Sequence, residues 1–294
     1  MRIAYDPTPL HATHRFLDVP RLAAELGYRW IQLTPHVDFV PFFRYPRVDR
    51  ALLRATKQAV ADAGIGISSL LPVQRWSSPD EPERKAAVRN WKRIVEIALE
   101  LEVSVINTEF SGRPERSEAS EAAFFDSMDD LLPIFEREGI RVNIDPHPDD
   151  FVEDGLEAVR IIRGLDSDAV GLAYVGSHTF HYGNKAAEIM RAAGARLGAA
   201  YAADTFDHTR SHGLRYITNP PGTTARVHQH LRIGDGDVDW TEFFAELAAV
   251  GFLAREDALI VSNVFAEDED WERAARHQLA AITGGVAAAT TGSG

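Results

Sequence analysis

The chain has 294 residues, of which 45% are hydrophobic and 26% are charged, as in ordinary soluble globular proteins. It contains no cysteine, which excludes disulfide bonds, thiolate nucleophiles and cysteine-bound zinc. Its formal charge of −13 disfavours a nucleic-acid partner, because phosphate binding depends on clustered lysine and arginine.

Neither a targeting segment nor a membrane span is expected. Charged residues enter the N-terminal stretch Met1–Pro7 too early for a signal peptide. No window approaches the roughly 18 uninterrupted apolar residues of a membrane helix. Together with the lack of cysteine, this predicts a cytoplasmic protein.

Apolar β-prone runs alternate with helical patterns along the chain. The predicted strands are Arg2–Tyr5, Arg29–Leu33, Gly66–Leu71, Val103–Thr108, Arg141–Asp145, Val170–Val175, Ala199–Ala203 and Ala258–Val264. The predicted helices are Pro20–Leu26, Val48–Ala63, Glu83–Leu101, Glu121–Glu138, Gly155–Arg163, Lys185–Leu197, Trp240–Val250 and Trp271–Thr283. Strands that alternate with helices pair in parallel, and eight such units close into an α/β fold, the (β/α)₈ TIM barrel. We predict a single TIM-barrel domain over residues 1–285 and a flexible C-terminal tail over residues 286–294.

Two further patterns stand out. The predicted third helix has an apolar face at helical spacing, formed by Val88, Trp91, Ile94, Val95, Ala98 and Leu99. The segment from Asp204 to Asp239 is a long insertion before the seventh helix, and long loops in compact domains are usually functional or disordered. Its four histidines favour a functional role.

Polar residues follow several of the predicted strands. In a parallel barrel the strand ends that precede helices lie on one face, so these residues converge there. They are Glu109, Asp145, His147, His178, His181, Asp204, Asp207, His208, Glu267 and Asp268. Converging carboxylates and imidazoles suit a divalent metal ion, and they equally suit proton abstraction beside a carbonyl group.

Each of the main candidates also has a purely structural interpretation. Asp145-Pro146-His147-Pro148 has the composition of a turn, but its place at a strand end favours catalysis. Glu109 is as consistent with a surface glutamate as with a functional one. His178 follows two small residues and is open to a ligand, whereas a buried histidine bonded to a carbonyl is the alternative.

Substrate contacts are predicted from charged and aromatic residues. Arg226, His228, His230 and Arg232 alternate along the chain, so a strand would place them on one side. The two histidines can chelate a metal and the arginines suit anionic or hydroxyl-rich substrates, although a solvated surface hairpin fits equally. Trp76 and the aromatic residues within 35–45 would stack on sugar rings, or form a lid core or a subunit contact.

A series of motifs runs from the fourth strand to the end of the eighth. They are Asn107-Thr108-Glu109-Phe110-Ser111-Gly112, Asp145-Pro146-His147-Pro148-Asp149-Asp150-Phe151, His178-Thr179-Phe180-His181-Tyr182-Gly183, Ala203-Asp204-Thr205-Phe206-Asp207-His208, Gly213-Leu214-Arg215-Tyr216-Ile217, Asn219-Pro220-Pro221-Gly222 and Arg226-Val227-His228-Gln229-His230-Leu231. The series resembles the xylose-isomerase-like sugar phosphate isomerase and epimerase family. Within that family it looks closest to the branch that includes the catalytic subunits of C-glycoside deglycosidases.

The resemblance implies a divalent metal ion, often Mn²⁺ or Mg²⁺, that polarises the carbonyl of a ketose or 3-keto-sugar while an acid–base residue moves the α-proton. Carried over, the strand-five ligand falls on Asp145, where the family usually has glutamate. The strand-six contribution is His178, because Val175 and Gly176 stand where many relatives have aspartate. The strand-seven histidine position falls on Tyr201, and the strand-eight glutamate falls near Asp268. These substitutions imply either a rebuilt ligand set, with Asp204 or His230, or a metal site that is weakened or lost.

The leading hypothesis is a metal-dependent sugar isomerase or epimerase acting on a keto-sugar or keto-glycoside. His147 or Glu109 would move the proton. The predicted metal ligands are Asp145, His178, Asp204, His230 and Asp268, and the predicted substrate contacts are Arg215, Arg226, His228, Arg232 and Trp76.

Two alternatives stand beside this hypothesis. One is a C-glycoside deglycosidase, a lyase that cleaves a carbon–carbon bond by β-elimination together with a small accessory subunit. The other is a non-catalytic sugar-binding subunit without a metal. The expected partners are a small carbohydrate and either a second copy of the chain or an accessory subunit, with neither nucleic acid nor membrane.

Overall fold

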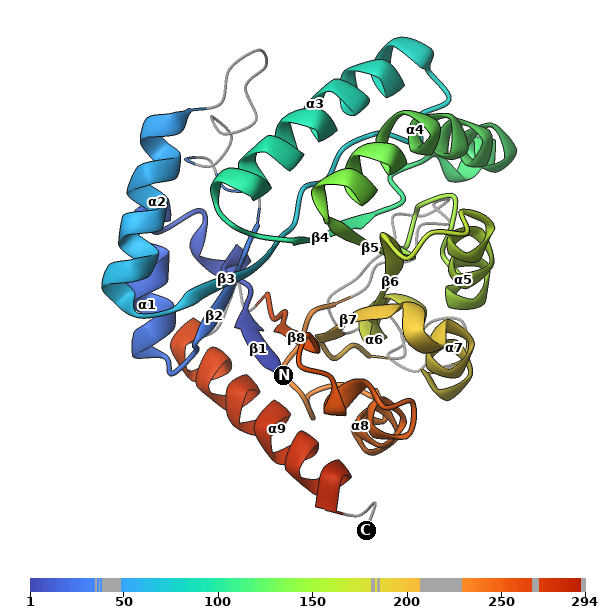
Figure 1. Ribbon diagram of the computed structural model, residues 1–294. Coiled ribbons are helices and arrows are strands. Elements are labelled where there is room, and N and C mark those ends of the chain that lie inside the picture. Colours follow the sequence, from blue (N-terminus) through green and yellow to red (C-terminus); the bar gives the residue numbers. More distant parts are fainter. Residues whose placement is uncertain are drawn as a thin grey trace, which may run out of the picture.

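Eight parallel strands form a closed barrel in which each strand pairs with the next and the last pairs with the first (Figure 1). The computed structural model describes residues 1–34, 36, 38, 49–180, 183, 186–206, 229–265 and 270–291. The strands are β1 (Arg2–Tyr5), β2 (Trp30–Leu33), β3 (Gly66–Leu70), β4 (Val105–Glu109), β5 (Arg141–Asp145), β6 (Val170–Val175), β7 (Leu197–Ala202) and β8 (Leu259–Ser262). The predicted TIM barrel is confirmed, and every strand boundary lies within two residues of its prediction.

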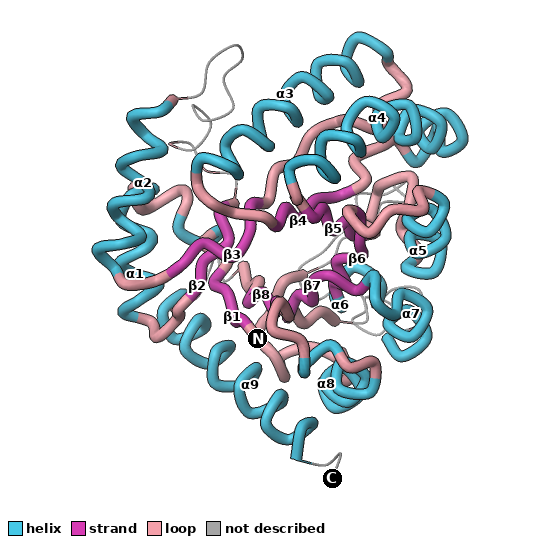
Figure 2. Tube along the Cα trace, in the orientation of Figure 1, coloured by secondary structure: helices cyan, strands magenta, loops and turns pink. Residues whose placement is uncertain are grey.

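Helices surround the barrel on the outside, as Figure 2 shows, apart from α6 (Gly176–Thr179), a single turn that directly follows β6. They are α1 (Val19–Glu25), α2 (Arg50–Ala63), α3 (Glu81–Glu100), α4 (Ser117–Glu138), α5 (Gly155–Gly164), α6 (Gly176–Thr179), α7 (Ala186–Ala193), α8 (Trp240–Ala249) and α9 (Trp271–Thr291). Aspartates begin five of them, because their side chains accept hydrogen bonds from first-turn amides of α2, α3, α5, α8 and α9. They are Asp49, Asp80, Asp154, Asp239 and Asp270. Within the described ranges, no helix combines the length and apolarity needed to cross a membrane.

Helix α9 is longer than predicted. It continues to Thr291, so residues 286–291, which we expected in a flexible tail, are helical. Val286 and Ala289 pack against the main core, and Gly285 admits the ring of Phe244, which a Cβ at that position would overlap. Packing against the barrel therefore carries the helix past the two glycines at 284 and 285. Residues 292–294 lie outside the described residues.

Every second residue of a barrel strand points into the interior. The apolar part of this interior consists of Ala4, Ala173, Val175, Ala199, Tyr201, Leu259 and Val261. Asn107 and Asn143 face each other in the register of β4 and β5, and Nδ2 of Asn143 donates to Oδ1 of Asn107 at 2.9 Å. Gly198 leaves the space that the Asn143 amide fills, because a Cβ there would overlap it.

Gln32 is the centre of the polar part of the interior. Its Oε1 accepts hydrogen bonds from the hydroxyl of Tyr201 at 2.6 Å, from Asn107 at 2.9 Å and from Ser69 at 3.0 Å. Its Nε2 donates to Oδ2 of Asp6 at 3.3 Å. Gln32 is fully buried, so these bonds satisfy an amide that would be costly to leave unpaired. One side chain in β2 thereby joins β3, β4, β7 and the residue that follows β1.

The larger hydrophobic core lies between the strands and the helices. Trp76 and Trp91 are fully buried within it and stack with their ring centroids 4.3 Å apart. The apolar face predicted for α3 is confirmed at five of its six positions, which are buried. Leu99 is the exception and is 42% exposed, because it lies at the edge of that face.

Replacing Trp91 with alanine should lower the free energy of unfolding by about 3–5 kcal/mol, since it empties a filled position between α3 and its neighbours. Leu99→Ala on the same helix should change that free energy by less than about 0.5 kcal/mol. Urea unfolding followed by circular dichroism measures both values. Equal losses for the two variants would contradict the assignment of Trp91 to the core.

Candidate functional site

The ends of β4 and β5 carry two carboxylates side by side. Glu109 and Asp145 are paired in the register of the two strands, and each lies two residues beyond an inward-facing asparagine. Both side chains therefore turn into the C-terminal end of the barrel. Asp145 is 5% exposed, whereas the side chain of Glu109 is 26% exposed. Glu109 is thus the more accessible of the two.

Asp145 begins a chain of contacts between side chains from different strand ends. Its Oδ2 lies 2.8 Å from Nδ1 of His178, in the short helix α6 that follows β6. Nε2 of His178 lies 3.3 Å from Nε2 of His230, and Nδ1 of His230 lies 3.2 Å from the backbone oxygen of Asn263. The structure therefore brings together Asp145, His178 and His230, three of the five residues predicted as metal ligands.

The hydrogen bond to Asn263 determines the tautomer of His230. A carbonyl oxygen only accepts, so Nδ1 of His230 carries a proton. Burial lowers the pKa of His230 to about 4, which makes the ring neutral at pH 7. Its Nε2 therefore presents a lone pair to His178. Because Nε2 of His230 can only accept here, the 3.3 Å contact calls for either a proton on Nε2 of His178 or a cation between the two nitrogens.

Burial also acts on Asp145 and raises its pKa well above the usual range of an aspartate. The charges of Glu109 and Asp150 raise it further. Such a carboxylate stays ionised only when a positive or hydrogen-donating group lies against it, and His178 is that group. Asp145 thus orients the imidazole of His178 and leaves its Nε2 directed at His230.

His147 lies on the other side of His178, and the two rings meet edge to face with centroids 4.6 Å apart. Nδ1 of His147 donates to the backbone oxygen of Pro148 at 2.7 Å, in the turn that the Asp-Pro-His-Pro sequence forms. Its Nε2 lies 3.8 Å from Oε1 of Glu109. Glu109 and His147 therefore form a second carboxylate–imidazole pair, next to the pair formed by Asp145 and His178.

Asp204 is not open to a metal ion, which corrects its predicted role as a ligand. It is fully buried, and each carboxylate oxygen accepts two hydrogen bonds. Oδ1 accepts from the backbone N–H of Thr205 and Val238, and Oδ2 accepts from the backbone N–H of Gly234 and the indole of Trp240. With all four contacts occupied, Asp204 holds the segment that leads into α8.

Trp76 does not face the site, which corrects its predicted contact with the substrate. Its ring is fully buried against Trp91 and has no free face for a sugar. Its Nε1 donates to the backbone oxygen of Glu109 at 3.1 Å. Trp76 therefore supports the strand end that carries Glu109.

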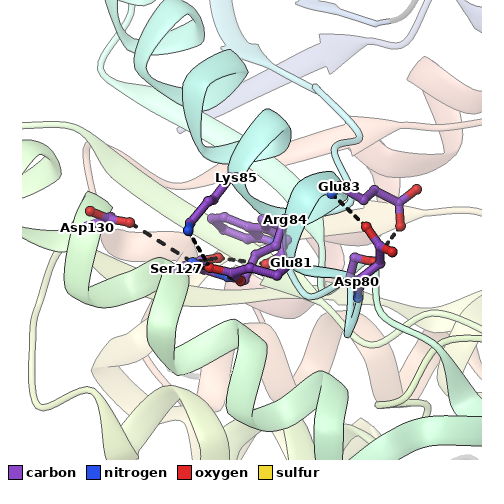
Figure 3. Close-up of polar contacts among 9 residues, drawn as sticks. Asp80, Glu81, Glu83, Arg84, Lys85, Ser127 and Asp130 are labelled. Atoms are coloured by element: carbon purple, nitrogen blue, oxygen red, sulfur yellow. Dashed lines mark hydrogen bonds and ion pairs between the residues drawn. The ribbon is translucent and has the colours of Figure 1, made fainter.

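Trp76 is itself held from the helical layer. Oγ of Ser127, in α4, donates to its backbone oxygen at 2.7 Å and accepts a hydrogen bond from Arg84 of α3 at 3.3 Å. Figure 3 shows Arg84 between the two helices, with Glu81 and Asp130 on either side of its guanidinium group. The position of Glu109 thus depends on packing that extends to the outside of the barrel.

The remaining predicted residues divide into two groups. Arg232 is described, and its Nε donates to Oδ2 of Asp235 at 2.6 Å, in a turn at the surface. Arg215, Arg226, His228 and Asp268 lie outside the described residues. Across the part of the chain that the structure describes, no group of three or more histidine, cysteine, aspartate or glutamate side chains is arranged to hold a metal ion.

Several residues of this region were missed by sequence reasoning. Asn263 fixes His230 through its backbone, and Asn107 and Asn143 form the layer beneath Glu109 and Asp145. The signal for that layer was present, because asparagine and carboxylate are two residues apart in both strands. No sequence pattern marked Asn263, since its contribution is a backbone oxygen.

Comparisons with known proteins agree with this architecture. A family model described as xylose isomerase-like TIM barrel matches residues 20–283. No curated protein matches the sequence. The crystal structure of the IolI protein with a zinc atom bound has a TM-score of 0.76 at 18% identity, over 98% of each chain.

Two further solved structures are similar over nearly their whole length. A D-psicose 3-epimerase with D-tagatose, from Clostridium cellulolyticum H10, has a TM-score of 0.75 at 14% identity, over 98% of this chain and 99% of that one. The 3-keto-D-glucoside 4-epimerase YcjR from E. coli, in its apo form, has a TM-score of 0.70 at 17% identity, over 96% and 99%. At these identities the likeness shows a common fold.

Asp204→Asn should lower the free energy of unfolding by about 1–3 kcal/mol, because an amide nitrogen cannot accept the bonds that one carboxylate oxygen accepts now. Asp235→Asn is the control, since it only breaks an exposed ion pair and should change that free energy by less than about 1 kcal/mol. Urea unfolding measures both. A stable Asp204→Asn protein that has lost bound metal would instead restore Asp204 as a ligand.

Proposed function

The chain belongs to the xylose isomerase-like TIM-barrel family, and from that premise we propose that it is a sugar isomerase or epimerase. It would act on a keto-sugar or keto-glycoside by moving a proton on the carbon beside the carbonyl group. The observation that carries the proposal is that two carboxylate–imidazole pairs touch at the C-terminal end of the barrel, where active sites of this fold lie. One pair is Glu109 with His147, the other is Asp145 with His178, and the two imidazole rings are in contact. Two of the similar structures are named as epimerases of a ketose and a keto-glucoside.

The two histidines fit two ligands of a divalent metal ion. For zinc, with metal–nitrogen bonds of about 2.0–2.1 Å at tetrahedral angles, two ligand nitrogens would lie about 3.3–3.4 Å apart. The Nε2 atoms of His178 and His230 are 3.3 Å apart. The other nitrogen of each ring is bonded to a carboxylate or a backbone oxygen, which is the usual arrangement behind metal-binding histidines.

In this proposal His178 and His230 would hold the ion, and Asp145 would orient His178 toward it. Asp268, the predicted ligand from the eighth strand, remains a proposal for a further ligand. A divalent ion such as Mn²⁺ or Mg²⁺ supplies a positive charge that polarises the substrate carbonyl and stabilises negative charge on its oxygen. The similar IolI structure is described with zinc, which supports testing zinc as well.

Glu109 is the residue we assign to the proton. Its carboxylate is the more accessible of the two, and its neighbour His147 lies within 3.8 Å. Glu109 takes the proton from the carbon beside the carbonyl, while the electron pair of that C–H bond moves toward the carbonyl group. His147 can accept or return the proton through its Nε2. Return to the opposite face of the same carbon gives epimerisation. Return to the former carbonyl carbon, with the neighbouring hydroxyl proton passing to the former carbonyl oxygen, gives isomerisation.

The proposed C-glycoside alternative begins with the same proton removal and ends with loss of a carbon-linked group. Its expected aromatic contacts within residues 39–45 lie outside the described residues. A substrate screen for this protein therefore includes C-glycosides beside ketoses and keto-glycosides.

Protein dialysed against trace Mn²⁺ or Zn²⁺ should retain about one ion per chain, measured by inductively coupled plasma mass spectrometry. His178→Gln and His230→Gln should each abolish this retention, because each removes one of two preorganised nitrogens. Asp145→Asn should weaken the affinity by about 10–100-fold, as expected for a residue behind a ligand. His277→Gln is the matched control, since His277 is exposed and bonds only to a nearby backbone oxygen among the contacts described for it. Undiminished metal in the His178 and His230 variants would overturn this ligand assignment.

Glu109→Gln should lower kcat by about 10²–10⁴-fold, because the amide cannot take up a proton. Exchange of substrate C–H for deuterium in D₂O, followed by proton NMR over the panel of keto-sugars, detects the proton step whatever the product. Glu115→Gln changes an exposed residue six positions after Glu109 and should leave the exchange rate unaltered. Absence of exchange with every carbonyl substrate would favour the sugar-binding subunit without activity.

A further inference from the structure

The loop that leaves β4 carries Glu109 and adopts an unusual backbone conformation. Ser111 has a φ of +57°, in the left-handed region that residues other than glycine seldom occupy. The next residue, Gly112, approaches its neighbours so closely that a Cβ would overlap the ring of Phe151 and the side chain of Ser120. Such a backbone persists only where surrounding contacts hold it.

One buried carboxylate supplies these contacts from the β5–α5 turn. Asp150 is 5% exposed, and its Oδ2 accepts a hydrogen bond from the backbone N–H of Ser111 at 2.5 Å. Its Oδ1 accepts from the backbone N–H of Gly112 and of Phe151, each at 2.7 Å. Burial raises the pKa of Asp150 to about 6 although these amides act in the opposite direction. The fold thus keeps a carboxylate at a position that disfavours its charge.

The opposite side of the same loop is held by hydrogen-bond donors from the β3–α3 segment. Trp76 donates to the backbone oxygen of Glu109, Ser77 donates to that of Phe110, and Arg75 donates to that of Gly112. The carbonyl groups of the loop are therefore bonded on one side, and two of its amides are bonded to Asp150 on the other.

Asp150 also belongs to the turn that carries His147. The backbone N–H of Asp150 donates to the backbone oxygen of His147 at 3.1 Å, three residues earlier. A single side chain thus connects the turn that holds His147 to the loop that holds Glu109. The separation of 3.8 Å between Glu109 and His147 depends on the relative placement of this loop and this turn.

We propose that Asp150 is a positioning residue, which sets the Glu109 carboxylate against the His147 imidazole by holding the amides of Ser111 and Gly112. This inference rests on the proposed function of the same site, since that function assigns the proton transfer to Glu109 and His147. Asp150 acts through these residues and need not touch the substrate.

Asp150→Asn tests this role without a change of size. Asparagine has one oxygen, so its NH₂ group would face an amide that now donates to a carboxylate oxygen, and at least one bond to the loop is lost. Asp154→Asn is the matched control in the same turn. Its Oδ1 accepts both capping amides, Leu156 and Glu157, and asparagine caps a helix as well as aspartate does.

Two readouts separate positioning from mere stability. Asp150→Asn should lower kcat by about 10–100-fold with little change in KM, as expected when a reacting group is misplaced. The ring ¹⁵N resonances of His147, measured by NMR, should shift in the direction seen for Glu109→Gln. Asp154→Asn should show neither effect.

Wild-type-like His147 resonances in Asp150→Asn would overturn the proposal. Equal kcat values for Asp150→Asn and Asp154→Asn would overturn it as well. The NMR readout needs no turnover, so it decides the role of Asp150 even where the proposed isomerase function fails. Where Asp150→Asn alone does not fold, the double variant with Ser111→Gly removes the backbone strain, and its His147 resonances decide the question in the same way.

Discussion

Closure of eight parallel strands sends every second side chain of each strand into one shared interior, and the rest of the structure follows from that constraint. Polar residues in this interior must find partners there, because water is excluded. Gln32 meets the requirement by joining side chains from three other strands and from the end of β1. The layer above it then has Glu109 and Asp145 already side by side, placed by the register of β4 and β5. The positions of these two carboxylates therefore follow from the packing of the barrel interior beneath them.

The two carboxylate–imidazole pairs differ because their surroundings differ. Asp145 is buried and bonded to His178, so it acts by orienting a ring. Glu109 is partly accessible and lies farther from His147, so its carboxylate is less confined by its partner. Two carboxylates at equivalent positions of neighbouring strands therefore have different surroundings, and the roles proposed for them follow that difference in burial and hydrogen bonding.

The strands and the convergence of Glu109, Asp145, His147 and His178 could be predicted from the sequence, because both follow from periodicity and from the rule that strand ends share one face. The hydrogen bonds of Asp204 could not, since they come from backbone amides and an indole some 30 residues later in the chain, a separation set by tertiary structure. The buried position of Trp76 could not be predicted for a related reason. An aromatic residue after a strand suits a sugar platform and a core equally well, and only the neighbouring Trp91 decides between them. The final turns of α9 likewise depend on contacts that composition does not reveal.

The two hydrogen bonds of Asn263 have a consequence for the order in which the protein folds. Its backbone oxygen fixes His230, while its side chain donates to Asp6 at 2.6 Å, across a sequence separation of 257 residues. Contacts of such span are among the slowest to form, because most of the chain must be closed into a loop first. A ribosome-bound chain has the first half of the barrel long before it has this contact. The residue that orients the histidine facing His178 is therefore also a residue that ties the two ends of the chain together, so the final geometry of this contact is complete only once the barrel has closed.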